Sequence, residues 1–168
     1  MMSSINLRAL EPEDLDLVYR IENDTALWQW GANSVPVSRF AVRQYLENQH
    51  ADIFQDEQLR LVIEVDGTGI GLLDLSAFSP LHLRAEVGIV LLAEHQHQGY
   101  AAAALRQLHD YAANHLHLRS LYAYVGEDNL PAQQLFRTVG YQPLASLPRW
   151  IEGKHTATLF QILLCKKG

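Results

Sequence analysis

Residues 85–105 read AEVGIVLLAEHQHQGYAAAAL. An apolar run ends in a short polar segment, and Gly99 then precedes an alanine-rich segment. We expect a strand before this polar segment and an amphipathic helix after Gly99. The first turn of a helix holds four backbone N–H groups without partners inside the helix, and the positive end of the helix dipole lies there. The pattern therefore indicates an anion site, such as a socket for the pyrophosphate of a coenzyme.

Side-chain size decides whether an anion reaches those N–H groups. Gly99 removes crowding at the tightest point, and residues 101–103 are all alanine. The polar residues 96–98 can extend into water while their N–H groups face a ligand. The alternative is a plain connection, because alanine is also the best helix former. Neither a Walker loop nor a GxGxxG fingerprint is present in the segment.

Composition narrows the class of protein. A chain of 168 residues with 48% hydrophobic and 19% charged residues fits one globular domain over 1–168. The formal charge of −6 argues against a nucleic-acid partner and suits a cationic substrate such as an amine. A single cysteine, Cys165, excludes an intrachain disulfide and favours a reducing compartment. With no signal-like start and no long apolar stretch, we expect a cytoplasmic protein without a membrane partner.

The rest of the chain alternates strand-like and helix-like segments. The predicted strands cover residues 5–10, 59–65, 70–75, 84–92, 121–125 and 156–165. The predicted helices cover residues 11–23, 39–48, a segment after Gly99, and a segment from about 129. Asp66-Gly67 predicts a tight turn of an antiparallel hairpin, and the run 84–92 lacks alternation, as expected of a central strand. This order predicts a mixed α/β sheet with helices on both sides.

Local signals also set helix ends and faces. Pro12 and the acidic residues after it suit the start of the first helix. Ser38 is the expected N-cap of the helix at 39–48. The residues expected to form the apolar contacts of that helix are Phe40, Val42 and Tyr45.

The motif at 96–101, Gln-His-Gln-Gly-Tyr-Ala, resembles the [Gln/Arg]-x-x-Gly-x-[Gly/Ala] pattern of the GNAT superfamily of N-acetyltransferases. It follows a long strand and opens a helix, as in that family. A second segment, VGEDNLPAQQLFRTVGYQP at 125–143, resembles the family's Asn-x-x-Ala-x-x-x-[Tyr]-x-x-x-Gly-[Phe/Tyr] stretch. The segments at 5–24 and 82–91 resemble the branch that contains spermidine and ribosomal-protein N-acetyltransferases.

The resemblance implies a GNAT fold, with a mixed, mostly antiparallel sheet, a splay between two central parallel strands, and helices on both faces. It implies acetyl-CoA as co-substrate and no metal. A primary amine, on a polyamine-like small molecule or a protein N-terminus, would attack the thioester directly in a ternary complex. A homodimer is possible, because dimers are common among relatives. Two alternatives stay open: a GNAT-fold module that binds acyl-CoA with little turnover, and a domain for another phosphate ligand.

The same resemblance assigns coenzyme contacts. The pyrophosphate would contact these residues: Gln96, His97, Gln98, Gly99, Tyr100, Ala101 and Ala102. The strand edge at Val90, Leu91 and Leu92 would hydrogen-bond the pantetheine arm, with a backbone amide near Leu91 facing the carbonyl oxygen. Asn129 would reach back to the coenzyme, and it is also a candidate helix N-cap; the two roles are compatible.

Phe136 departs from the family pattern. It takes the place of the tyrosine that, in relatives, lies by the coenzyme and protonates the leaving thiolate, and phenylalanine has no proton to give. Tyr141, Tyr124 or a water are candidate substitutes, and the sequence does not choose among them.

On the acceptor side the resemblance points to Glu86, because Glu86 begins the central strand where related enzymes often keep an acidic residue near the acceptor. It is the candidate general base and a candidate contact for a cationic amine; the alternative is a salt bridge to Arg84 or Arg39. Trp28 and Trp30 lie in segments that line the acceptor groove in relatives, so the resemblance implies that they bind the acceptor, and aromatic faces attract cations. Phe78 and Trp150 lie in segments that line the same groove in relatives, and core packing is the alternative for all four aromatic residues. His95 and His97 lack the partners that a metal site needs.

Overall fold

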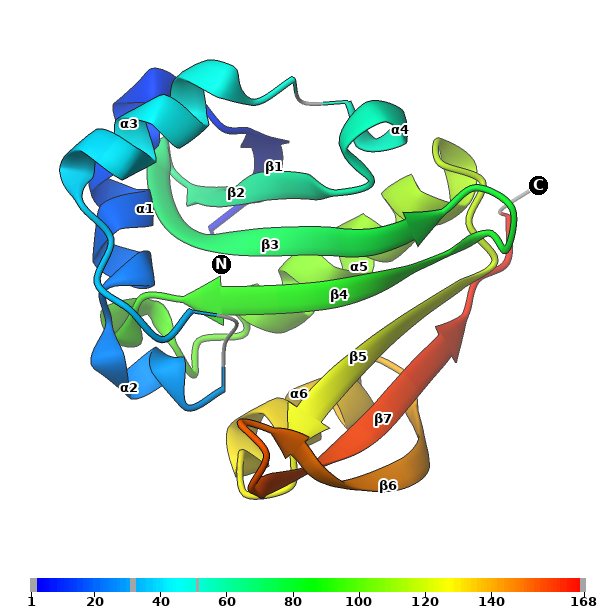
Figure 1. The fold of residues 1–168 in the computed structure, drawn as a ribbon. Coiled ribbons are helices and arrows are strands. Elements are labelled where there is room, and N and C mark those ends of the chain that lie inside the picture. The colour runs from blue at the N-terminus through cyan, green and yellow to red at the C-terminus, as the bar shows by residue number, and fades with distance from the viewer. Residues whose placement is uncertain (1–2, 31–32, 51, 167–168) are drawn as a thin grey trace.

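The computed structural model describes residues 3–30, 33–50 and 52–166. In these ranges the chain forms one sheet of seven strands in the order β1-β2-β3-β4-β5-β7-β6 (Figure 1). The strands are β1 Ile5–Ala9, β2 Leu59–Val65, β3 Thr68–Ser79, β4 Arg84–Leu91, β5 Ser120–Gly126, β6 Gln142–Ile151 and β7 His155–Leu163. The helices are α1 Leu15–Glu22, α2 Thr25–Trp28, α3 Arg39–Asn48, α4 Ile53–Asp56, α5 Tyr100–Asn114 and α6 Leu130–Thr138.

The sheet is antiparallel except at its centre, where β4 and β5 run parallel. Their pairing covers only Arg84–Glu86 against Ser120–Tyr122. Beyond Glu86 the two strands diverge, as Figure 1 shows. The predicted mixed, mostly antiparallel sheet with a splay between two parallel strands is therefore confirmed.

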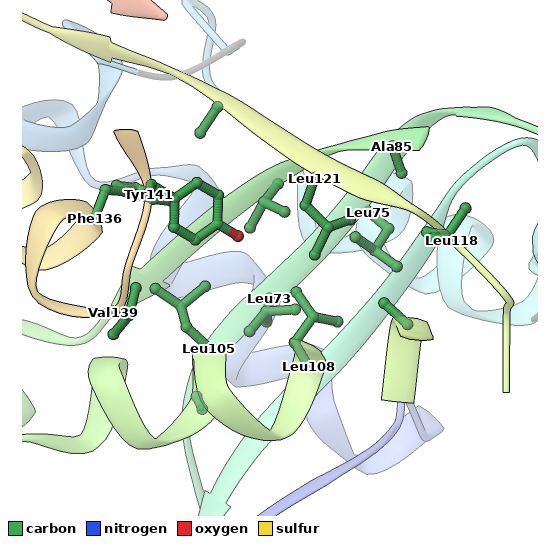
Figure 2. Packing of buried hydrophobic residues seen from close by; sticks show 14 of the residues in the cluster. Leu73, Leu75, Ala85, Leu105, Leu108, Leu118, Leu121, Phe136, Val139 and Tyr141 are labelled. Atoms are coloured by element: carbon green, nitrogen blue, oxygen red, sulfur yellow. The ribbon is translucent and has the colours of Figure 1, made fainter. Parts of the chain in front are cut away.

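Helices cover both faces of the sheet. On one face α1 and α3 pack together through Val18, Ile21, Val42 and Leu46 over Val62 of β2. On the other face α5 and α6 cover the larger core (Figures 1 and 2). Val62 of β2, Leu72 of β3 and Val90 of β4 thus face α1 and α3. Side chains alternate across a strand, so the even-numbered residues near them share this face, up to the register shifts at the ends of β3.

The structure confirms the predicted N-cap of α3 and the predicted turn between β2 and β3. The Ser38 hydroxyl accepts from the Ala41 N–H at 3.1 Å and caps α3. Asp66 and Gly67 both have positive φ between β2 and β3, as a tight hairpin turn requires. The buried face of α3 was predicted incorrectly, since Val42 is buried but Phe40 is 64% exposed and Tyr45 lines a cleft. Leu46, four residues after Val42, completes the buried face instead.

Strand β6 was absent from the predicted elements. It forms the sheet edge beside β7, and almost all of its residues are exposed. An exposed edge strand needs no alternation of apolar and polar residues. Pro143 and Pro148 also make the sequence unlike a strand, although edge strands tolerate proline. The strand is fixed by pairing with β7, a contact that the local pattern does not reveal.

Candidate functional site

A cleft of about 970 Å³ lies on the α1–α3 side of the sheet and extends to the end of β5. Its lining on the sheet includes six even-numbered strand residues: Arg60, Asp74, Ser76, Glu86, Gly88 and Tyr124. Glu22, Trp28, Trp30 and Tyr45 line it from the helical side, and Asn129 lines it at the start of α6. The cleft and the splay therefore meet where β4 leaves β5.

Strand register arranges the floor in rows. Arg60, Asp74 and Gly88 lie opposite one another on β2, β3 and β4. In the next row Ser76 lies opposite Glu86, and Glu86 lies opposite Tyr122 on β5. The polar groups are thus placed by backbone pairing rather than by flexible loops.

An ion-pair network lies on the β2–β3 part of the floor. The Arg60 guanidinium donates to both carboxylate oxygens of Asp74, at 2.7 and 2.9 Å, and to Glu22 Oε1 at 2.8 Å. Burial disfavours the charge of Arg60, but the bonds to Asp74 outweigh burial and the pKa of Arg60 is raised. A bidentate pair of this kind is geometrically specific. The network holds the side chains of Glu22 and Asp74 in place along the cleft.

Glu86 differs from those two carboxylates. It is half-buried and forms no ion pair within the described residues. The alternative partner Arg39 pairs with Asp16, and Arg84 forms no bridge to Glu86 in the same part of the chain. Burial raises the pKa of Glu86, because desolvation disfavours the charged form. An unpaired carboxyl with a raised pKa suits both proton acceptance and binding of a cation.

The loop between β4 and α5 has the backbone shape expected of an anion site. Gly99 is the N-cap of α5 with φ 84°, a left-handed conformation that favours glycine, and His97 also has a positive φ of 59°. Within the described ranges, the N–H groups of Tyr100, Ala101 and Ala102 have no protein acceptor. These groups point out of the N-terminus of a helix of 15 residues.

The glutamines of this loop do more than extend into water. Gln96 Nε2 donates to the Leu91 carbonyl at 3.0 Å, and Gln98 Nε2 donates to the Glu94 carbonyl at 3.0 Å. Glu94 in turn binds Arg20 of α1 through two bonds of 2.6 and 2.9 Å. The loop is thereby held against β4 and α1.

Pairing with β3 determines in which direction the Leu91 N–H of β4 points. The Leu92 N–H donates to the Ile70 carbonyl at 2.9 Å, so it points toward β3. Successive peptide groups of a strand point to opposite edges. The Leu91 N–H therefore points toward the splay, as its carbonyl does.

Asn129 has the predicted N-cap role, because its Oδ1 accepts from the Ala132 N–H at 3.3 Å. It also lines the cleft. Phe136 is buried in the core, with its ring edge-on to Tyr141 at a centroid distance of 4.9 Å. Its predicted contact with the coenzyme stays a prediction.

The candidate tyrosines lie in different places. Tyr141 is 1% exposed between α5 and the sheet (Figure 2), and its hydroxyl is 3.1 Å from His109 Nε2. Burial raises the pKa of Tyr141 and lowers that of His109 to about 4. His109 of α5 is thus a partner of a core hydroxyl. Tyr124 instead lines the cleft.

Trp28 and Trp30 line the cleft, and their binding of the acceptor stays a prediction. Trp28 Nε1 donates to the Glu22 carbonyl at 2.9 Å. The Trp30 ring lies directly on Gly126, where a Cβ would overlap it, and so covers the end of β5. Trp150 is half-exposed and packs on Tyr124 at a centroid distance of 5.0 Å. Phe78 is buried against Phe54 and belongs to the core.

Sequence analysis missed several cleft residues: Glu22, Tyr45, Asp56, Arg60 and Asp74. A signal was present in the strands, since Arg60 and Asp74 are charged residues within the otherwise apolar runs LRLV and GLLDLSAF. Charges inside central strands require partners. Their pairing, however, depends on the register between β2 and β3.

Two further observations concern metals and membranes. Among residues 3–30, 33–50 and 52–166, no three His, Cys, Asp or Glu side chains are grouped so as to hold an ion. Over the same ranges, no helix is long and apolar enough to cross a bilayer.

Comparison with known proteins identifies the family. Residues 4–142 match the model of the acetyltransferase (GNAT) domain. The chain belongs to the GNAT family of acetyltransferases. It is therefore an acetyl-CoA-dependent N-acetyltransferase, with acetyl-CoA as its co-substrate. The alternative of a binding module with little turnover is not supported.

Similar proteins of this GNAT family include several polyamine enzymes. The spermidine N(1)-acetyltransferase of Escherichia coli K12 is 32% identical over 138 residues, which cover 82% of this chain and 73% of the relative. The Vibrio cholerae enzyme of the same name is 30% identical over 142 residues, covering 84% and 80%. A crystal structure of spermidine N-acetyltransferase from Vibrio cholerae, in complex with CoA and spermine, superimposes with a TM-score of 0.84 at 27% identity and covers 95% of each chain.

Proposed function

We propose that this enzyme acetylates a primary amine of a polyamine such as spermidine. The observation that carries the proposal is the charge of the cleft, which is lined by the carboxylates of Glu22, Asp56, Asp74 and Glu86 against one guanidinium, Arg60. A polyamine is a flexible chain of cations, so carboxylates spaced along a cleft complement it. The spermidine acetyltransferases among the relatives support the same substrate class.

The two sides of the cleft have separate tasks. Trp28 and Tyr45 supply aromatic faces for the alkyl segments and the cations of the amine. Of the four carboxylates that line the cleft in the described chain, Glu86 is the one without a salt bridge. It lies at the last paired residue before the splay. An amine that binds Glu86 therefore has its nitrogen beside the gap between β4 and β5.

The residues of the coenzyme side fit acetyl-CoA. The unpartnered N–H groups of Tyr100, Ala101 and Ala102 would bind the pyrophosphate, as Gly99 leaves the approach open. The splay would admit the pantetheine arm, where the Leu91 N–H faces it. When bound, acetyl-CoA supplies a thioester carbonyl, and a backbone N–H aimed at its oxygen stabilises the charge that develops there.

Proton movement is assigned to Glu86 and Tyr124. Glu86 removes a proton from the ammonium form of the acceptor, directly or through a water, and its raised pKa brings it closer to the operating pH. Of the tyrosines, Tyr124 lines the cleft while Tyr141 lies in the core, so Tyr124 is the candidate donor to the leaving thiolate.

Assembly of several copies is the expected quaternary state. A Vibrio cholerae spermidine N-acetyltransferase structure described as dodecameric superimposes with a TM-score of 0.79 at 27% identity, covering 95% of this chain and 93% of that one. Strand β6 is an exposed sheet edge with Leu144 and Trp150 on its surface, which suits burial against another copy.

Release of the CoA thiol with a set of amines tests the proposal. We expect spermidine to give a kcat/KM at least about 10-fold higher than a peptide with a free N-terminus or a neutral monoamine of similar length. Raised ionic strength is expected to increase the KM for spermidine, because salt screens charges. A peptide N-terminus preferred over every polyamine would contradict the proposal.

A further inference from the structure

Gly88 is an unusual residue for the middle of a central strand. It lies on β4, where β3 is paired on one side and β5 has already diverged on the other, and its residue surface is exposed. On the floor of the cleft it has Asp74 opposite it on β3, with Glu86 and Val90 two residues away on its own strand. Solvent thus reaches the bare backbone at the centre of the sheet.

Neither packing nor conformation requires glycine there. A Cβ built on Gly88 would have only the Asp74 Cβ within 4 Å among the described residues, at an ordinary contact distance of 3.8 Å. Its φ lies outside the left-handed range. At Gly71 and Gly126, by contrast, a Cβ would overlap the Val90 carbonyl oxygen and the Trp30 ring. The effect of glycine at position 88 is therefore to leave the cleft open above the backbone, where any other residue would place a side chain.

That space lies where an acceptor nitrogen must pass. The pairing of β4 with β5 ends at Glu86 with Tyr122, and Gly88 is the next residue on the same face. Residues two apart on a strand are about 7 Å apart. An amine held at Glu86 and directed into the splay therefore passes over Gly88, and a side chain at 88 would narrow this passage.

We propose that Gly88 sets the width of the cleft at the reacting nitrogen and lets the enzyme acetylate primary amines on branched carbons as well as on unbranched ones. The inference rests on the proposed function. The chemical step is unchanged: a bond forms between the amine nitrogen and the acetyl carbonyl carbon, and the carbon–sulfur bond breaks. Its electron pair leaves with the CoA sulfur. Counted from the neutral amine, which forms when the ammonium gives its first proton to the base, the nitrogen loses one further proton on becoming an amide, and the thiolate gains one to form the CoA thiol.

The probe is 1,4-diaminopentane, in which one amine is on a CH₂ group and the other is on a carbon that bears a methyl group. Liquid chromatography with mass spectrometry separates the two monoacetylated products. Their ratio compares both amines in one molecule, so it does not depend on how much of a variant is folded. Gly88→Ala and Gly88→Val are compared with the wild type. Ala145→Val, at an exposed position of β6, is the matched control.

We expect the wild type to form both products. In Gly88→Val the ratio of the branched to the unbranched product falls at least about 10-fold, because one carbon in a substrate pocket changes specificity by roughly 10–200-fold. Gly88→Ala is expected to give a smaller decrease, and Ala145→Val to keep the wild-type ratio.

The outcomes separate the two proposals. An unchanged ratio in Gly88→Val, or a wild type that forms no branched product, overturns the role of Gly88 while spermidine turnover leaves the proposed function intact. A wild type that acetylates neither spermidine nor the diamine overturns both.

Discussion

The coenzyme loop and the acceptor cleft differ in how the chain builds them. The loop is one contiguous segment, residues 96–102, and it offers backbone N–H groups around Gly99. The cleft collects side chains from α1, α2, α3, β2, β3, β4 and β5. Recognition by backbone needs only a local conformation, whereas recognition by side chains needs correct register between strands that are distant in sequence. The first kind of site is read from a motif, and the second only from the folded sheet.

The largest expected effect separates catalysis in the cleft from binding in the loop. Glu86→Gln is expected to lower kcat at least about 100-fold, since a general base contributes about 10²–10⁴-fold, while the affinity for acetyl-CoA stays unchanged. Steady-state kinetics and calorimetry measure the two quantities. Glu152→Gln, in the turn between β6 and β7, is the control. A variant with wild-type kcat would remove Glu86 from the mechanism.

The pH dependence sharpens the same assignment. A general base works when deprotonated, so kcat/KM should decrease as the pH falls through the pKa of Glu86. Because burial raises this pKa, the decrease should begin at a higher pH than for an exposed glutamate. The acidic limb of the profile should disappear in Glu86→Gln. If the decrease of kcat/KM at low pH were unchanged in Glu86→Gln, a group other than Glu86 would cause it.

A substitution in the coenzyme loop should lower the affinity for acetyl-CoA. Gly99→Val is expected to weaken acetyl-CoA binding at least about 10-fold, because a β-branched side chain is strained at φ 84° and crowds the first turn of α5. Calorimetric titration measures the affinity. Gly67→Val carries the same strain at φ 80° in the β2–β3 turn, where a Cβ meets nothing within 4 Å. Equal weakening by both variants would mean that general destabilisation, not the loop, causes the loss.

Two tyrosine variants compare the cleft with the core, because Tyr124 lines the cleft and Tyr141 is buried. Tyr124→Phe is expected to lower kcat roughly 10-fold with little effect on thermal stability, a modest factor for a lost general acid because a thiolate leaves readily. Tyr141→Phe should keep kcat but destabilise the fold by about 1–3 kcal/mol, since His109 Nε2 loses its partner in the core. Turnover and thermal denaturation are measured on both. The reverse pattern would return the donor role to Tyr141.

The smallest expected effect concerns the link between the two regions. Glu94→Gln weakens the exposed pair with Arg20 that ties the loop to α1. Exposed pairs contribute little because solvent screens their charges, so the acetyl-CoA affinity should decrease by no more than about 5-fold. Titration at low and high salt should show that the difference shrinks as salt rises. A loss above 50-fold would mean that this pair, rather than backbone geometry, holds the loop.

Sequence alone predicted the parts of the fold that depend on local signals. The strand–Gly99–helix unit, the Ser38 and Asn129 caps and the Asp66-Gly67 turn all follow from short patterns. Strand β6 and the Arg60–Asp74 pair do not follow from short patterns, because both depend on pairing with a neighbouring strand. Glu86 was predicted through a family resemblance, and its role stays a prediction. The exposed surface at Gly88 could be recognised only in the structure. The remaining cleft residues are polar positions whose common face appears only after the strands align.

The structure of the enzyme with CoA and spermidine tests the central claim most directly. The account predicts the pyrophosphate on the N–H groups of residues 100–102, and a polyamine nitrogen within hydrogen-bonding distance of Glu86. A pyrophosphate bound away from the start of α5, or a polyamine bound outside the carboxylate-lined cleft, would contradict it.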